Sequence, residues 1–156
     1  MNFNLADLSR RLENIVRYGV IAEVKHGRVP LARVKFGDIT TALIPIAATR
    51  AGATKTWCPP TVGEQCIIFS PSGDLAAGVV FPGVASNHNQ APDDNPDNHR
   101  IQYPDGATVD YNHADHHYTI TLPADGKFSF VVGNTTLELT TDGTMLRTPK
   151  FEGVKS

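Results

Sequence analysis

The chain has 156 residues, and its 14 basic and 16 acidic side chains leave a formal net charge of -2. This length accommodates one ordinary domain or two small ones, and the balanced charge provides no global positive field that would attract nucleic acid or an anionic membrane. Hydrophobic residues make up 40% of the chain, so we expect it to fold, and its 13 glycines and 11 prolines indicate many turns between short strands.

The beginning of the chain resembles neither a signal peptide nor a membrane anchor. Residues Met1–Leu5 contain no basic region followed by an apolar one, and apolar stretches elsewhere are only a few residues long. We therefore expect the protein to be synthesised in the cytoplasm and to reach any other location by another route.

Residues 1–18 are expected to form an N-terminal amphipathic helix. Their apolar side chains recur at helical spacing and would share one face, which comprises Leu5, Leu8, Leu12, Ile15 and Val16. Asn4 is a suitable N-cap, and Gly19 is expected to end the helix. Such a face must pack against another surface, either the rest of the chain or a neighbouring protein.

From residue 19 to residue 84 the hydrophobic period changes from helical to alternating. Turns rich in glycine, proline and aspartate separate the expected strands, which cover residues 21–25, 31–36, 41–46, 64–70 and 75–81. Five short strands in this arrangement are typical of a small Greek-key barrel of the OB type. The sequence therefore predicts an all-β fold in which an OB-fold-like barrel follows the helix.

Residues 85–100 are rich in asparagine, aspartate and proline, which predicts a linker between two domains. Its carboxylates, Asp93, Asp94 and Asp97, could form an acid–base pair or a calcium site, but the Asp-x-Asp-x-Asp-Gly pattern of a calcium loop is missing. We interpret these three side chains as solvated groups of the linker.

Residues 101–156 are expected to form short strands that cannot bury a core alone. The strands are predicted at residues 108–111, 118–122, 127–132, 135–140 and 145–148, and no helix covers them. Open strand edges would also promote aggregation. Wrapping three copies about an axis would pair the edges and bury the apolar rows, so we predict a homotrimer. The predicted trimer core contains Tyr118, Ile120, Leu122, Phe128, Phe130, Val132, Leu137 and Leu139.

Three histidines between two of these strands, His113, His116 and His117, are candidate metal ligands. On a threefold axis one histidine would become three ligands, which is enough to hold a metal ion or an anion. The neighbouring Asn112 and Asp115 are typical turn residues, and we interpret the segment as a polar loop without a metal.

Several short segments resemble the phage baseplate assembly protein V family, the central spike of contractile phage tails and R-type pyocins. They are Trp57–Gln65, with its Trp-x-Pro-Pro-x-Val-Gly-Glu-Gln pattern, then Ser70–Asp74, Gly78–Val80 and Tyr103–Ala107. The resemblance covers roughly residues 5–122, and the first segment is its most specific part.

The resemblance implies a structural protein of the virion. Its barrel would form a collar on the tail hub, and residues 101–156 would form an intertwined triple-stranded β-helix or β-prism as a homotrimer. The spike would pierce the outer membrane of the host cell when the tail sheath contracts. We expect the helix to contact the hub through Leu5, Leu8, Leu12 and Ile15.

The end of the sequence departs from the family pattern. Members commonly end in a His-x-His motif whose histidines, contributed by three chains, hold an iron ion, whereas this sequence ends in Phe151–Ser156. We therefore expect no iron and no other cofactor, although an axial ion is compatible with a trimer. A truncated chain or a separate tip protein would explain the departure.

Catalytic motifs are missing from the sequence: it contains no G-x-S-x-G, H-E-x-x-H or P-loop pattern, so we do not expect an enzyme. The alternative function is an OB-fold module that binds single-stranded nucleic acid or protein. A basic group with one aromatic residue in the first strands favours that alternative: Lys25, His26, Arg28, Arg33, Lys35 and Phe36. Because the overall charge is balanced, we interpret the group as an outer face that meets acidic neighbours and expect no nucleic-acid partner.

Overall fold

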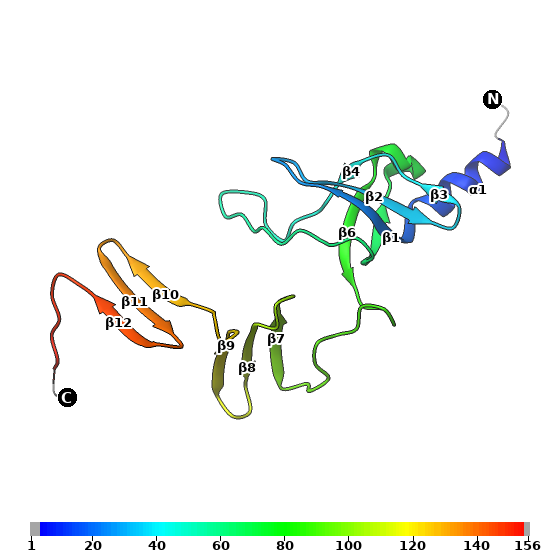
Figure 1. The fold of residues 1–156 in the computed structure, drawn as a ribbon. Coiled ribbons are helices and arrows are strands. Elements are labelled where there is room, and N and C mark those ends of the chain that lie inside the picture. The colour runs from blue at the N-terminus through cyan, green and yellow to red at the C-terminus, as the bar shows by residue number, and fades with distance from the viewer. Residues whose placement is uncertain (1–3, 155–156) are drawn as a thin grey trace. The chain divides into compact units, whose positions relative to one another are not determined.

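The computed structural model describes residues 4–154, and its chain divides into two compact units, Met1–Gln90 and Ala91–Ser156 (Figure 1). The boundary between the units falls inside the interval 85–100 that the sequence predicts to be a linker. Among the described residues, no helix is long and apolar enough to cross a membrane.

The first unit begins with helix α1, Leu5–Asn14, whose N-cap is Asn4 as predicted: its side-chain oxygen accepts a hydrogen bond from the Ala6 amide at 3.2 Å. The predicted helix end is wrong, because strand β1, Val16–Lys25, begins at once and pairs with another strand from Val16 onward. Gly19 lies inside β1. A Cβ atom at this position would lie 2.4 Å from a methyl group of Val34, so glycine is needed for close strand packing and does not cap the helix.

The barrel is an antiparallel sheet with the strand order β3-β2-β1-β5-β6, and β4 pairs with β2. Its strands after β1 are β2 (Leu31–Phe36), β3 (Ile39–Thr40), β4 (Ile44–Pro45), β5 (Gln65–Phe69) and β6 (Val79–Val84). An isolated parallel bridge joins Ile46 to Val80, and the Ala47 amide donates to the Val80 carbonyl at 2.8 Å. These bonds connect the residues that follow β4, which pairs with β2 near one edge of the sheet, to β6 at the other edge, and they close the barrel.

Two predicted strands of the barrel differ from the observed ones. Of the strand expected at residues 41–46, only Ile44–Pro45 forms a strand, β4, and β3 lies just before the expected range. The buried Thr41 hydroxyl accepts a hydrogen bond from the Val34 amide at 3.0 Å and so takes the place of a backbone acceptor between the two short strands. The strand expected at residues 75–81 begins only at Val79. Asp74 accepts a hydrogen bond from the Ala76 amide at 3.0 Å and so caps a short 3-10 turn, Leu75–Ala77.

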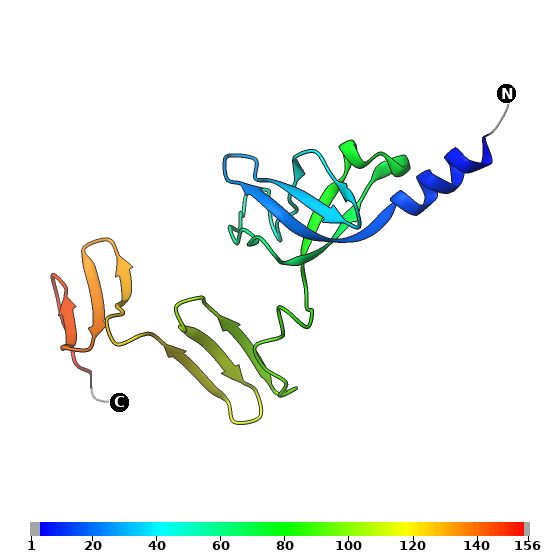
Figure 2. The same cartoon turned by 45° about the vertical axis from the view of Figure 1, so that its right-hand side comes forward.

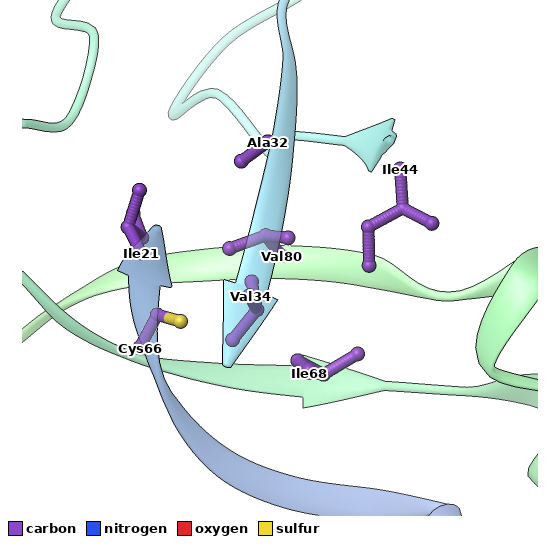
Figure 3. Packing of buried hydrophobic residues seen from close by; sticks show 7 residues of the cluster. All are labelled: Ile21, Ala32, Val34, Ile44, Cys66, Ile68 and Val80. Atoms are coloured by element: carbon purple, nitrogen blue, oxygen red, sulfur yellow. The ribbon is translucent and has the colours of Figure 1, made fainter. Parts of the chain in front are cut away.

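The barrel interior is filled by side chains from five strands, which point toward one another in Figure 3. They are Ile21, Ala32, Val34, Ile44, Cys66, Ile68 and Val80, each at most 1% exposed. Burying one such aliphatic side chain contributes on the order of 1.5–3 kcal/mol, so this cluster stabilises the unit. Burial also raises the pKa of the Cys66 thiol to about 11, which keeps it protonated and inert at neutral pH.

The second unit consists of two antiparallel meanders of three strands each. The first contains β7 (Asn98–Gln102), β8 (Thr108–Asn112) and β9 (His117–Thr121); the second contains β10 (Phe128–Val132), β11 (Thr135–Thr140) and β12 (Gly143–Arg147). All five predicted strands of this region are found, with bounds that differ by at most two residues. Strand β7 was not predicted, and its first three residues lie in the interval assigned to the linker.

The second unit contains almost no core of its own. Among its described residues, Ala107 is the only hydrophobic residue that is buried, at 5% exposure. The expectation that this region cannot bury its apolar rows within one chain is therefore confirmed for the described residues.

Candidate interaction surfaces

One face of the first distal meander is apolar. The strand register places Ile101 opposite Val109 and Val109 opposite Ile120, and the next row contains His99, Tyr111 and Tyr118. Directly paired residues and residues two apart lie on one face of a sheet, so all six side chains share that face. Tyr118 is 60% exposed, although its ring centroid lies only 6.1 Å from that of Tyr111.

The second meander repeats this arrangement. Phe130 pairs with Leu137 and Leu137 with Leu146, and the neighbouring row contains Phe128 and Leu139. The rings of Phe128 and Phe130 pack edge to face with centroids 4.7 Å apart, a favourable geometry for aromatic pairs. Phe130 nevertheless remains 58% exposed, so the described chain covers little of this face.

The two faces contribute to one apolar hollow of about 720 Å³ within the second unit. Six of the eight residues predicted for a trimer core line it: Tyr118, Ile120, Leu122, Phe128, Phe130 and Leu139. The other two, Val132 and Leu137, lie on the same face of the second meander outside the hollow. Four further residues of these apolar faces were not predicted from the sequence, namely Ile101, Val109, Tyr111 and Leu146, although the alternation in Thr108–Asn112 is a usable signal.

The opposite face of the first meander is polar and is organised around Arg100. Its Nε donates to the carboxylate of Asp110, and its guanidinium also lies 3.5 Å from Asp93. Asp93 accepts further hydrogen bonds from the Asn95 amide at 3.0 Å and from the Asn98 side chain at 2.8 Å. These contacts attach the segment before β7 to the sheet, so Asp93 has a structural role that the interpretation as a solvated side chain did not include.

The pKa values of both carboxyl groups are shifted downward in this network. Hydrogen bonds from the Asn95 amide and the Asn98 side chain lower the pKa of Asp93, and the hydrogen bond from Arg100 lowers that of Asp110. The second meander has a similar ion pair, because the Lys127 ammonium lies 3.3 Å from the Glu138 carboxylate. Both meanders therefore combine an apolar face with a charged one.

The three histidines do not converge on one point within the described chain. The imidazole of His113 lies 3.3 Å from the Asp97 carboxylate, and His117 lies 3.3 Å from the Thr119 hydroxyl. His116 occupies the turn between them with a φ of 53°. Across the described residues, no group of three or more histidine, cysteine, aspartate or glutamate side chains is placed to hold a metal ion.

On the first unit, the apolar stripe of α1 is uncovered, and Figures 1 and 2 show the helix extending away from the barrel. Leu5, Leu8, Leu12 and Ile15 are 77%, 45%, 59% and 40% exposed. The opposite side carries ion pairs of Asp7 with Arg10 and Arg11, which are too exposed to contribute much stability. The stripe is the kind of surface that requires a partner.

A second apolar surface, which the sequence analysis missed, covers the outside of the sheet β1–β5–β6. The register places Val16, Phe69 and Val79 in one row and Tyr18, Ile67 and Phe81 in the next. The rings of Phe69 and Phe81 meet edge to face at 5.1 Å. Phe69, Val79 and Phe81, together with Ile15 and the turn at residues 70–72, line a shallow apolar hollow of about 610 Å³, so the helix stripe continues onto the barrel.

The basic group of the first strands is partly neutralised. Arg33 forms an ion pair with Glu23 at 2.8 Å and donates to the Thr41 carbonyl at 3.2 Å. The guanidinium of Arg17 stacks over the Phe36 ring at 5.4 Å and pairs with Glu13. These contacts reduce the positive charge and the aromatic surface that a nucleic-acid groove would need.

Comparison with known proteins identifies the barrel. Residues 17–84 match the family model described as the type VI secretion system/phage-baseplate injector OB domain. The chain is also 37% identical over 110 residues to the spike protein of Escherichia phage P2. This alignment covers 69% of the chain and 51% of the relative, so the chain spans about half of that protein's length. Residues 17–84 thus belong to the injector OB domain family, which confirms the resemblance to the phage baseplate assembly protein V family.

Proposed function

We propose that this protein is a structural subunit of a phage tail spike and that it acts as a homotrimer. The observation that carries the proposal is the apolar face shared by the two distal meanders, which one chain leaves exposed even though its strands are well paired. Three copies around an axis would bury this face and leave the charged faces, with Arg100 and Glu138, toward solvent.

The proposed role is mechanical. A trimer of distal units would form a triple-stranded β-helical needle at the tip of the tail, and the barrel would join it to the baseplate. When the sheath contracts, the needle would be driven through the outer membrane of the host. This role needs stiffness and no bond chemistry, in keeping with a match to a baseplate family and to a spike protein rather than to an enzyme family.

We place the contact with the tail hub on α1 and on the outer barrel surface that continues it. Both surfaces are apolar and exposed, and Ile15 belongs to both. The likeness to a baseplate domain supports association with other baseplate proteins. The proposal includes no iron and no other cofactor, and it leaves room for a separate protein at the tip.

Sedimentation equilibrium tests the assembly directly. We expect three chains per particle at micromolar concentration, because the apolar distal face is too large to remain in water. A particle of the mass of one 16.9 kDa chain under these conditions would contradict the proposed architecture.

A further inference from the structure

The last turn of α1 is held against the barrel by an unusually close backbone contact. A Cβ atom on Gly73 would lie 2.2 Å from the Arg11 carbonyl oxygen and 2.6 Å from the Arg11 Cα. Gly73 also has a φ of +72°, a backbone conformation that residues with a side chain rarely adopt. Both the space and the backbone conformation therefore require glycine at this position.

The turn that contains Gly73, residues Ser70–Gly73, is also hydrogen-bonded to the end of the helix. The Ser70 amide donates to the Ile15 carbonyl at 2.8 Å, and the Gly73 amide donates to the Ser70 carbonyl at 3.0 Å. Next to this contact, the Asn14 side chain accepts a hydrogen bond from Arg17 at 3.2 Å and is almost fully buried. We refer to the contacts that join Arg11 and Ile15 to the turn Ser70–Gly73 as the helix clasp.

The clasp matters because α1 has little else to stabilise it. The helix has only 10 residues, and isolated helices shorter than about 12–15 residues are marginal in water. Its apolar stripe is exposed along the described chain, so tertiary packing supports mainly the last turn. Without the clasp, we expect the helix to unfold, so that its apolar side chains would no longer be held in a fixed position relative to the barrel.

We propose that Gly73 is a positioning residue for hub binding. By admitting the Arg11 backbone, it fixes the helix so that Leu8 and Leu12 form one surface with Ile15, Phe69 and Phe81. A partner would then meet a preformed surface and would not have to order the helix on binding. This inference rests on the proposed role of α1 in contacting the hub.

The test compares Gly73→Ala with Gly37→Ala in the full chain. Gly37 also has a positive φ, +56°, but a Cβ atom added there would meet no other atom within 4 Å, so this variant introduces similar backbone strain without the clash. Hydrogen–deuterium exchange reports on the amides of Leu8–Asn14 and, separately, on strands β1 and β5. Binding to the purified cognate hub protein is measured on the same samples.

We expect Gly73→Ala to lose protection in the helix amides, to keep protection in β1 and β5, and to bind the hub at least about tenfold more weakly. Gly37→Ala should match the wild type in helix protection and in binding. Wild-type protection of the helix in Gly73→Ala would overturn the inference, as would full hub binding by a variant whose helix is unprotected. Failure of the wild type to bind the hub would instead refute the proposed function. The exchange measurements would then still show whether Gly73 holds the helix against the barrel.

Discussion

Arg100 shows how single residues define the start of the distal unit. Its guanidinium lies between Asp110 on β8 and Asp93 in the segment that precedes β7. The neighbouring Asn98 donates to Asp93 at 2.8 Å and accepts from Asn112 at 2.8 Å. Strand β7 has a polar sequence, and it forms because each of these polar groups has a hydrogen-bond or ion-pair partner. These partners offset the cost of removing the groups from water.

This network predicts that the distal unit is sensitive to acid. Both carboxyl groups have a lower pKa in the folded protein, so their stabilisation is present above the pKa of an unfolded aspartate, about 3.9, and is lost as the pH falls through the folded values. Replacing Asp110 with asparagine should lower the melting temperature at pH 7. It should also reduce the decrease in melting temperature between roughly pH 5 and pH 3, where protonation of a paired carboxylate favours unfolding.

Thermal denaturation across this pH range checks the expectation. The matched control is Asp125→Asn, because none of the described residues forms an ion pair or side-chain hydrogen bond with that turn carboxylate. The control should melt like the wild type at every pH. An unchanged pH profile in Asp110→Asn would show that the Arg100 network does not contribute to stability.

At the scale of elements, α1 and the outer surface of β1–β5–β6 form the part of the first unit that lacks a cover. A barrel needs only one apolar side for its core, here the side with Ile21 and Ile68. The second apolar side, with Tyr18, Phe69 and Phe81, adds nothing to that core. Its presence is therefore better explained by binding than by folding.

Leu12→Asp is expected to weaken hub binding strongly while the protein remains folded and keeps its assembly state. Leu12 is 59% exposed in the described chain, so a charge there costs little in the free protein but becomes buried against the partner. A central apolar contact is worth about 2 kcal/mol or more, which corresponds to roughly 30-fold weaker binding.

The matched control is Ala6→Asp, an exposed helix position that faces away from the stripe, which should bind normally. Titration of each variant with the purified hub protein gives the dissociation constants. Equal binding by Leu12→Asp and the wild type would remove the stripe from the interface, and so would hub binding by a chain that lacks Leu5–Asn14.

At the scale of the whole molecule, the two units differ in how they can be stable. The first has a closed barrel with a buried core, whereas the second pairs its strands but leaves aromatic residues such as Phe130 and Tyr118 exposed. In the proposed trimer, the apolar area of the second unit would be buried between copies of the chain. Assembly and distal folding should therefore be coupled.

Phe130→Asp should prevent assembly, since it would place three carboxylates in an apolar interior at a cost of several kcal/mol. Val131→Asp is the matched control. Val131 is the next residue of β10, is 65% exposed and points to the opposite face, so the trimer should tolerate a charge there. Light scattering coupled to size-exclusion chromatography gives the mass of each variant. A soluble trimer of Phe130→Asp would contradict the inward direction of this face.

Much of the architecture was accessible from local patterns. The alternation in Phe128–Val132 and Thr135–Thr140 predicted both the strands and the face that each apolar row occupies, because the side-chain period of a strand is a local property. The stripe Leu5–Leu8–Leu12 likewise predicted α1. The resemblance centred on Trp57–Gln65 predicted the baseplate family, which the comparisons confirm.

The remaining features depend on contacts between residues distant in the chain. Strand β7 is too polar to be recognised alone, and it forms because Arg100 meets Asp110 across the ladder. The end of α1 was predicted at Gly19 because a glycine after a helix is typical of a cap, whereas pairing of Val16 with Phe69 ends the helix earlier.

By itself, then, the sequence determined the periodicities: one helix, a short-stranded barrel and a distal region whose apolar rows exceed what one chain can bury. Only the tertiary structure decided which surfaces those rows form. The outer apolar side of β1–β5–β6 and the contact of Gly73 with Arg11 arise from strand register and close approach, which no local pattern encodes. The physical reason is that register and packing are set by partners dozens of residues away, and their positions are known only once the chain has folded.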